Sequence, residues 1–538
     1  MNKSHRLLIA TAICCITVAA LSQSRNYPAP STPLHAKQEL IRSNGAEPES
    51  LDPAIVETMS AMSVVNDLFE GLTAVNADGK VVPGIAQSWK QGNPTTWVFE
   101  LRKNAVFSNG EPLTASDFVY SWQRFLDPKT ASGYAGTFGM FLVNGAEIVE
   151  GKKAPGTLGV KALNAHTLEV KTTLPVPFMP SLVASSQFAP VQKATVEKFG
   201  PNWTKPAHLI GNGAYVLREA IVNNKIVLQK NPRYWDSANV NLTQVTFLPI
   251  ESQNADLLLY RSGETDLTYT LPPGAYAGLR SQYPKEIYNT PLLQISYLPL
   301  NRRDPLLKDV RVRKALSMVI DRDVLTQKIT AEGQIPLYGL IAKGVVGADV
   351  ISYDWATWPM AQRVAEAQKL LAQANVKAGT KLKMSYVTSD YAKKSNIFVG
   401  SEWKTKLGLV LDMENSEQRV HVKRLRDGDY QIGRYGWTVD YNDATSFLAT
   451  VQCGSPQNMT QGCSPEADAL ADQASQQTDP QRRKTLLTQS AALAMEDYPL
   501  IPMYQTTAAR LVKSYVGGYG NGNPQDKTRS KDLYIHKH

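Results

Sequence analysis

The chain contains few cysteines and few long apolar runs. The first shortage limits the number of disulfides, and the second limits the number of membrane-spanning helices. Its 538 residues include 4 cysteines, of which Cys14 and Cys15 lie in an apolar segment at the N-terminus. After that segment, no run of apolar residues approaches the roughly 20 that a membrane-spanning helix needs. We therefore expect the rest of the chain to fold in water.

The sequence also lacks the motifs of common hydrolases and of nucleic-acid-binding proteins. It has no H-E-x-x-H metal motif and no G-x-S-x-G nucleophile motif. Its 57 Lys and Arg residues are scattered, so the net charge of +9 indicates a solvated surface and not a nucleic-acid interface. Asp440 and Asp443 could form the paired carboxylates of a glycosidase, although long chains offer many such pairs. We expect binding without catalysis, and no metal or other cofactor.

The N-terminus has the pattern of a secretory signal peptide, predicted to span residues 1–24. A basic start that includes Lys3 and Arg6 precedes an apolar stretch of about 15 residues and then small residues at a plausible cleavage point. An uncleaved membrane anchor is the alternative, but the apolar stretch is short for one. Ile13 precedes Cys14, so the small residue of a lipoprotein cleavage site is missing. The pattern predicts an exported protein.

Two cysteines remain after the signal peptide, Cys453 and Cys463. They flank a turn-rich loop of Gly, Ser, Pro and Asn residues. Because exported chains meet an oxidising environment, we expect a disulfide between them, with two free thiols as the alternative. Closing so short a loop should stabilise the fold by about 2–3 kcal/mol.

The length and the order of the predicted elements indicate an α/β protein with two or three lobes. Helix and strand patterns alternate in the second half, which predicts a mostly parallel sheet covered by helices. Predicted helices there begin at Asp304-Pro305 and at Pro359 and cover 392–407 and 418–426, and predicted strands cover 382–386, 409–413 and 430–437. Predicted strands of the first half cover 96–101, 225–229, 244–248 and a segment ending at Tyr269, and predicted helices follow Leu113 and cover 253–261.

One stretch combines a predicted strand with an acid just past its end. Residues 430–437 read as the strand, and Asp440 follows among Tyr435, Trp437 and Tyr441. Ligands of open α/β sheets bind outside the carboxyl ends of the strands. A carboxylate beside aromatic rings suits a primary ammonium, since the acid supplies charge while the rings exclude water. The stretch therefore predicts a binding protein for an amine-bearing ligand.

Further motifs occur in order along nearly the whole chain after the signal peptide. They are SLDP at 50–53, DLFEGL at 67–72, WVFELR at 97–102, SNGEPLTASDFVYSW at 108–122, GNGAY at 211–215, NPRYW at 231–235 and DVRVR at 309–313. Together they resemble the periplasmic oligopeptide-binding proteins of ABC importers, which are family 5 extracellular solute-binding proteins.

The resemblance implies a periplasmic binding protein of the type II-like fold with three lobes. Lobe I would comprise 25–69, 194–293 and 508–538, lobe II 70–193 and lobe III 294–507. Two main lobes would close by a hinge around an extended peptide whose main chain pairs with the protein backbone. The implied partners are an oligopeptide ligand and an inner-membrane ABC permease, with the protein itself a periplasmic monomer.

The resemblance also assigns roles to single residues. Asp440 matches the acid that takes the peptide α-ammonium; the alternative is an acid in a surface turn. Arg434 matches a cleft arginine, with a structural ion pair as an equally weighted alternative. The implied ligand-binding residues are Asp440, Trp437, Gly436, Arg434, Glu57, Tyr134, Tyr269 and Tyr297.

The chain departs from the family where a peptide carboxylate would be bound. Cations of the family's peptide binder are replaced by Thr330, Ala392 and Leu425, a pocket tryptophan by Gln418, and two bridged cysteines by Gln294 and Thr438. Two possibilities therefore stay open. The carboxylate is bound by Arg434, Arg302 or Arg303, or the ligand is a modified peptide such as a cell-wall fragment.

Overall fold

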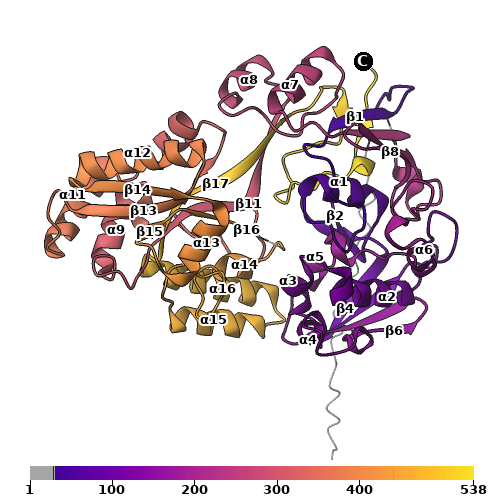
Figure 1. Cartoon of the computed structure of the whole chain (residues 1–538), viewed down its shortest axis with the longest axis horizontal. Coiled ribbons are helices and arrows are strands. Elements are labelled where there is room, and N and C mark those ends of the chain that lie inside the picture. The colour runs from indigo at the N-terminus through magenta and orange to yellow at the C-terminus, as the bar shows by residue number, and fades with distance from the viewer. Residues whose placement is uncertain (1–27, 30, 440) are drawn as a thin grey trace, which may run out of the picture.

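The computed structural model describes residues 28–29, 31–439 and 441–538, so the predicted signal peptide and Asp440 lie outside the described residues (Figure 1). The described elements form three groups, each around its own buried core. We call these groups lobes I, II and III and define each lobe by the helices and strands that it contains. The residue boundaries given for the lobes in the sequence analysis stay a prediction. No helix of the described part is long and apolar enough to cross a membrane.

Lobe I is built around a sheet of order β1-β10-β9-β8, in which the N-terminal strand β1 runs parallel to β10. The C-terminal pair β18 and β19 packs on the same core as β1. Its elements are β1 (Glu39–Ser43), α1 (Met59–Leu68), α6 (Lys193–Phe199), β8 (Tyr215–Ile221), β9 (Lys225–Lys230), β10 (Gln244–Leu248), α7 (Gln253–Ser262), α8 (Tyr276–Gln282), β18 (Val516–Gly517) and β19 (Tyr534–Ile535).

The segment before Tyr269 is not a strand, contrary to the prediction. Only Leu267 makes isolated bridges, to Arg42 and Val512. The backbone N–H of Tyr269 donates to the buried carboxylate of Asp256 (2.8 Å) instead of to a neighbouring strand. The apolar pattern of this segment thus reflects burial beside the sheet and not a place in it.

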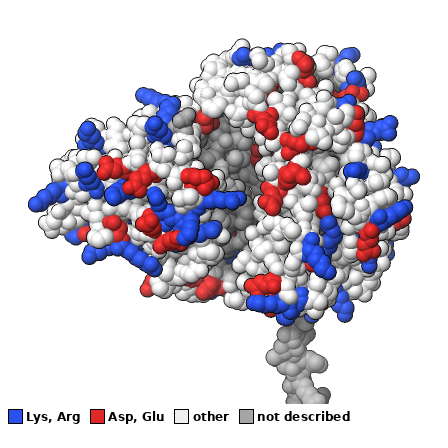
Figure 2. Space-filling view, in the orientation of Figure 1, with Lys and Arg blue, Asp and Glu red and all other residues white. Residues whose placement is uncertain are grey.

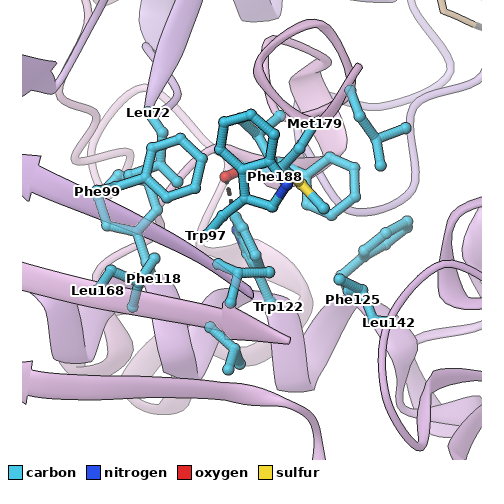
Figure 3. Close-up of a cluster of buried hydrophobic side chains, with 14 of the residues drawn as sticks. Leu72, Trp97, Phe99, Phe118, Trp122, Phe125, Leu142, Leu168, Met179 and Phe188 are labelled. Carbon is cyan, nitrogen blue, oxygen red and sulfur yellow. Dashed lines mark hydrogen bonds between the residues drawn. The ribbon is translucent and has the colours of Figure 1, made fainter. Parts of the chain in front are cut away.

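Lobe II packs helices on an antiparallel sheet of order β4-β5-β7-β6. Its core is rich in aromatic rings, and the indole N–H of Trp122 donates to the carbonyl of Phe188 at 2.9 Å (Figure 3). The predicted cap of α2 is present, since Asp117 accepts the backbone N–H of Thr114 at 2.8 Å. The elements are β2 (Thr73–Val75), β3 (Val81–Pro83), β4 (Ala86–Asn93), β5 (Thr96–Leu101), α2 (Ala115–Leu126), α3 (Ala135–Gly139), α4 (Gly145–Val149), β6 (Val160–Asn164), β7 (Thr167–Lys171) and α5 (Met179–Leu182).

Lobe III contains two sheets, and only one is parallel. The predicted alternation of strands and helices is confirmed in the parallel sheet β14-β13-β15. The second sheet, β12-β17-β11-β16, is antiparallel, so the lobe is less parallel than predicted. The elements are β11 (Ile287–Pro299), α9 (Val310–Met318), α10 (Arg322–Val324), β12 (Ile335–Pro336), α11 (Met360–Gln373), β13 (Lys381–Val387), α12 (Asp390–Leu407), β14 (Val410–Ser416), α13 (Gln418–Asp427), β15 (Ile432–Gly433), β16 (Tyr435–Thr438), α14 (Thr445–Leu448), α15 (Pro465–Ser475), α16 (Pro480–Glu496) and β17 (Leu500–Leu511).

Two predicted elements of lobe III differ in detail. The helix expected from Asp304 begins only at Val310, because Asp309 caps it by accepting the N–H of Arg311. The strand expected over 430–437 is interrupted at Arg434, where the chain leaves the parallel sheet as β15 and joins the antiparallel sheet as β16. The disulfide between Cys453 and Cys463 is present, between α14 and α15.

Strands β11 and β17 form a long antiparallel ribbon that crosses from lobe I to lobe III (Figure 1). At the lobe I end Ile287 pairs with Leu511, and at the lobe III end Pro299 pairs with Leu500. The pairing register shifts between Pro291 and Ile295. A ribbon with irregular pairing midway between two lobes is a suitable place for a hinge.

Candidate ligand-binding cleft

A deep hollow separates lobe III from lobes I and II (Figure 2). Strand β16 and helices α13 and α14 stand on the lobe III side, and the β11/β17 ribbon passes above. Acidic side chains gather along the opposite rim, whereas a basic group reaches the lobe III rim over α13. On α13, Arg419, Lys423 and Arg426 are exposed. The two sides of the hollow thus differ in charge.

Strand β16 is the outermost strand of its sheet, so within the described part of the chain one of its backbone edges is not paired with a strand. Gly436 is exposed, and Trp437 is half-buried with its indole N–H donating to Ser446 (3.3 Å). An unpaired edge with little side-chain cover can accept an extended peptide as an additional strand. The predicted ligand-binding residues Gly436 and Trp437 therefore lie on an edge suited to that use.

Arg434 is buried, with 9% of its surface exposed, at the point where the chain passes between the two sheets. Its guanidinium donates to Ser395 (2.9 Å), Asn396 (3.1 Å) and Tyr504 (2.8 Å). Among the described residues no carboxylate pairs with it, so the structural ion pair considered as an alternative is not found there. A buried cation held only by neutral partners keeps an unbalanced positive charge, which favours an anionic group nearby.

A chain of polar groups extends from Arg434 through Tyr504, Tyr391 and Gln334 to the carboxylate of Glu332, which accepts from the Gln334 amide (3.2 Å). Tyr504 shares a hydrogen bond with Tyr391, whose hydroxyl accepts from the amide of Gln334 (2.8 Å). The oxygen of the same amide accepts from Thr330 (3.0 Å). Burial raises the pKa of Tyr391 well above its usual range, so it stays a neutral hydroxyl. The structure thus brings Thr330 and Arg434 into one network.

The other positions where the family has cations carry no charge either. Ala392 follows Tyr391 directly and is 7% exposed, and Leu425 is fully buried against Gly433. Gln294 and Thr438, which stand where two cysteines are bridged in the family, are direct partners in the β11–β16 pairing. The correspondence of these positions with the family stays a prediction from the sequence.

Asp440 lies outside the described residues, and the described residues on both sides of it are anchored. The N–H of Val439 donates to Leu293 (3.0 Å), and the carboxylate of Asp443 accepts two hydrogen bonds from Arg483 (2.7 and 2.9 Å). Asp443 is 1% exposed, which makes this pair a structural one and removes Asp443 from any glycosidase pair. Val439 is thus attached to β11 and Asp443 to α16.

Of the remaining predicted ligand-binding residues, Glu57 and Tyr134 lie together, whereas Tyr269 and Tyr297 each lie elsewhere. The carboxylate of Glu57 packs so closely on Gly133, next to Tyr134, that any side chain at Gly133 would collide with it. Tyr134 stacks on Phe138 with ring centroids 5.5 Å apart. Tyr269 is half-buried in lobe I, far along the chain from both. The structure thus brings Glu57 and Tyr134 together where lobe I meets lobe II.

Tyr297 and the two arginines proposed for the carboxylate are placed differently from the expectation. Tyr297 is fully buried in the lobe III core, so a ligand does not reach it in this conformation. Arg302 is engaged by Asp497, and its neighbour Arg303 is exposed beside the same turn. Neither arginine joins the network of Arg434.

A serine–histidine contact in lobe III was not foreseen from the sequence. Ser385 Oγ lies 3.0 Å from Nδ1 of His421, whose Nε2 lies 2.8 Å from the carbonyl oxygen of Arg434. Both side chains are buried, and burial lowers the pKa of the imidazole. With Nε2 donating to the carbonyl and the serine shielded from solvent, the pair holds the Arg434 backbone in place and offers no accessible nucleophile.

The fold and the cleft match proteins that bind solutes outside the cytoplasm. Residues 80–459 match the family described as "Bacterial extracellular solute-binding proteins, family 5 Middle", and the chain belongs to this family.

Within it, the chain is 40% identical over 542 residues to the periplasmic oligopeptide-binding protein OppA of Escherichia coli (strain K12), covering 100% of both chains. The unliganded open form of the periplasmic murein tripeptide-binding protein MppA is 38% identical, with a TM-score of 0.89 over 95% of this chain and 99% of that one. OppA of Haemophilus influenzae in complex with RPPGFSPFR is 36% identical, with a TM-score of 0.72 over 94% of this chain and 100% of that one.

Proposed function

We propose that this chain is a periplasmic solute-binding protein that captures oligopeptides by their free amino group and delivers them to an inner-membrane ABC permease. The observation that carries the proposal is the edge strand β16, which borders the hollow and leads directly into the acid at residue 440. A peptide added to this edge would have its main chain paired by backbone groups. Affinity would then depend little on the ligand's side chains.

The amino end of the ligand is assigned to Asp440. The acid comes two residues after Thr438, the last residue of β16, and the aromatic side chains of Trp437 and Tyr441 flank it in the sequence. An ammonium that loses water in such a place needs a carboxylate partner, and the pair is strong only while both charges are present. Free N-termini would therefore be required.

The far end of the ligand is assigned to the wall formed by Arg434, Tyr391 and Gln334. Arg434 supplies a buried positive charge to this wall, and its hydrogen bonds to Ser395, Asn396 and Tyr504 hold it below the surface, while Glu332 accepts from Gln334 at the other end. Thr330 and Ala392 add no charge. A terminal carboxylate would have to displace Ser395, Asn396 or Tyr504 to pair directly with the guanidinium, so we expect the wall to tolerate ligands without one.

Because this wall would not require a terminal carboxylate, a modified peptide is the second candidate ligand. The relative MppA is named for a murein tripeptide, whereas OppA is named for oligopeptides. Mass spectrometry of the material that co-purifies with the protein would identify which class it carries.

Binding without turnover is part of the proposal. The family is defined by solute binding, and the serine–histidine contact of lobe III is sealed from solvent. The test is calorimetry with an unmodified tripeptide and its N-acetylated form, followed by chromatography of the peptide after prolonged incubation. Stoichiometric binding of the free amine alone, with the peptide recovered intact, supports the proposal. Equal binding of both forms, or cleavage, would overturn it.

A further inference from the structure

Lobes II and III touch at the end of the hollow that lies opposite the β11/β17 ribbon (Figure 1). The contact is aromatic. The ring of Tyr441, from lobe III, lies parallel to Phe178 of lobe II, with centroids 4.2 Å apart and 3° between the ring planes. Phe141, also of lobe II, meets the same tyrosine edge-on at 5.7 Å and 88°. Tyr441 thus packs against the core of the opposite lobe.

On its own side, Tyr441 belongs to a loop that moves with lobe III. The buried pair of Asp443 and Arg483 ties the loop to α16. The side chain of Asn442 accepts the N–H of Val346 (3.0 Å), and Val439 bonds Leu293 on β11. With attachments on both sides of residue 441, the ring cannot swing away independently of the lobe.

On the other side, Phe141 and Phe178 move with lobe II. They are 7% and 9% exposed and pack edge-on against each other at 5.5 Å. The carbonyl of Phe141 accepts the N–H of Thr173, which fixes the backbone beneath the ring. Tyr441 therefore joins two rigid bodies and is not a mobile side chain lying on one of them.

A contact that persists while two lobes stand apart must lie close to the axis about which they rotate, because points far from the axis separate most. The hollow is open in this structure, and its shape agrees with the open form of MppA at a TM-score of 0.89. The β11/β17 ribbon marks one end of the axis, and the contact of Tyr441 with Phe141 and Phe178 marks the other. Closure is then a rotation about the line between them.

We propose that Tyr441 is the second pivot of lobe closure and a positioning residue for the amine anchor beside it, a role that rests on the proposed function. Residue 440 directly precedes Tyr441 in the sequence, so closure would displace a ligand group bound there less than one bound at the mouth of the hollow. The amino end of a ligand would then find its partner already placed in the open protein. The rest of the peptide would be enclosed afterwards, so binding would begin at the amino end.

The test uses distance measurements between spin labels at Lys161 on β6 and Lys369 on α11, both exposed, in the ligand-free protein. Tyr441→Leu should broaden the distance distribution, whereas Tyr441→Phe keeps the ring stack and should leave it unchanged. Phe178→Leu should broaden it as well, and the double leucine variant should add little, since one contact is removed in either case. Thermal unfolding of each variant checks that the lobes stay folded.

Affinity provides the second measurement. Because loss of the contact leaves the lobes less well placed for the ligand, Tyr441→Leu should weaken binding of a free-amine tripeptide about tenfold. Tyr441→Phe keeps the ring stack and loses the hydroxyl contact to Thr445 (3.4 Å), so it should weaken binding less. An unchanged distance distribution in Tyr441→Leu, or tighter binding by it, would overturn the pivot. The distance measurement needs no ligand, so its outcome is independent of whether the amine requirement itself holds.

Discussion

Glu70 provides the sharpest test of how the chain ends are held in lobe I. Its carboxylate is 1% exposed and accepts from Lys531 (2.6 Å), Trp235 (2.6 Å) and Tyr234 (2.8 Å), with Arg529 at 3.7 Å. Lys531 and Arg529 come from the C-terminal segment, 461 and 459 residues further along the chain. One acid therefore fixes the C-terminal segment against the body of the lobe.

The magnitude follows from the pKa of the carboxyl group. Burial alone would raise it, but Lys531 and Arg529 outweigh burial and lower it from 4.5 to about 2. At about 1.4 kcal/mol for each pH unit, this corresponds to about 3 kcal/mol of folding free energy. Replacing the acid by a neutral isostere also removes the carboxylate that balances the buried charges of Lys531 and Arg529, for which about 3–5 kcal/mol is usual. Both estimates give a loss of about 3–5 kcal/mol in the unfolding free energy of Glu70→Gln.

The sign of the pH dependence is fixed as well. A carboxyl whose pKa is lowered by folding stabilises the folded state above its unfolded pKa, and this contribution is lost as the pH falls through the folded pKa. The difference in unfolding free energy between the parent and Glu70→Gln should thus be full at pH 7, decline below about pH 4.5 and vanish near pH 2. Urea denaturation over this range measures it.

The control is Glu150→Gln, which removes an acid of the same kind from an exposed pair with Lys152. An exposed pair of this kind contributes little, so unfolding at pH 7 should change by less than about 1 kcal/mol. If Glu70→Gln were as mild as Glu150→Gln, or if its deficit did not depend on pH, the reasoning about the buried network would be refuted.

Three predictions concern the ligand. Asp440→Asn should weaken binding of a free-amine peptide about a hundredfold or more at neutral pH, which calorimetry measures; unchanged affinity would exclude this acid as the anchor. Amidating the C-terminus should cost less than tenfold, because Arg434 is already engaged by Ser395, Asn396 and Tyr504; a larger loss would make Arg434 a direct carboxylate ligand. Ligand should reduce the radius of gyration in small-angle scattering at constant oligomeric state, and identical curves with and without ligand would contradict closure.

Local patterns of the sequence predicted the elements whose stability is local. Asp117 and Thr114 cap α2 as expected, and α11 follows Pro359. The prediction fails where distant segments decide the geometry. Residues 430–437 have a uniform strand pattern, yet their first part pairs in the parallel sheet as β15 and their second part in the antiparallel sheet as β16. Only the pairing with distant strands determines that the strand is interrupted at Arg434.

The same division holds in the candidate site. The edge strand and the acid at residue 440 are adjacent in the sequence, so one stretch was enough to find them. The network behind Arg434 joins residues from 330 to 504, and none of Gln334, Tyr391 and Tyr504 carries a signal on its own. Hydroxyl and amide groups are common on any chain, and only their meeting around a buried cation gives them a role.

The two ends of the cleft therefore impose different demands on a ligand. In the proposed function, the amino end meets a full charge placed beside a pivot, where the geometry changes little during closure. The far end meets a wall in which the cation Arg434 is 9% exposed and already hydrogen-bonded to neutral groups. A strict requirement at one end and a permissive wall at the other select for the free amine and leave the length and the terminal group of the ligand weakly specified. Such a protein accepts a class of amine-bearing peptides, and its selectivity should change most on substitution near residue 440 and least on substitution at Thr330 or Ala392.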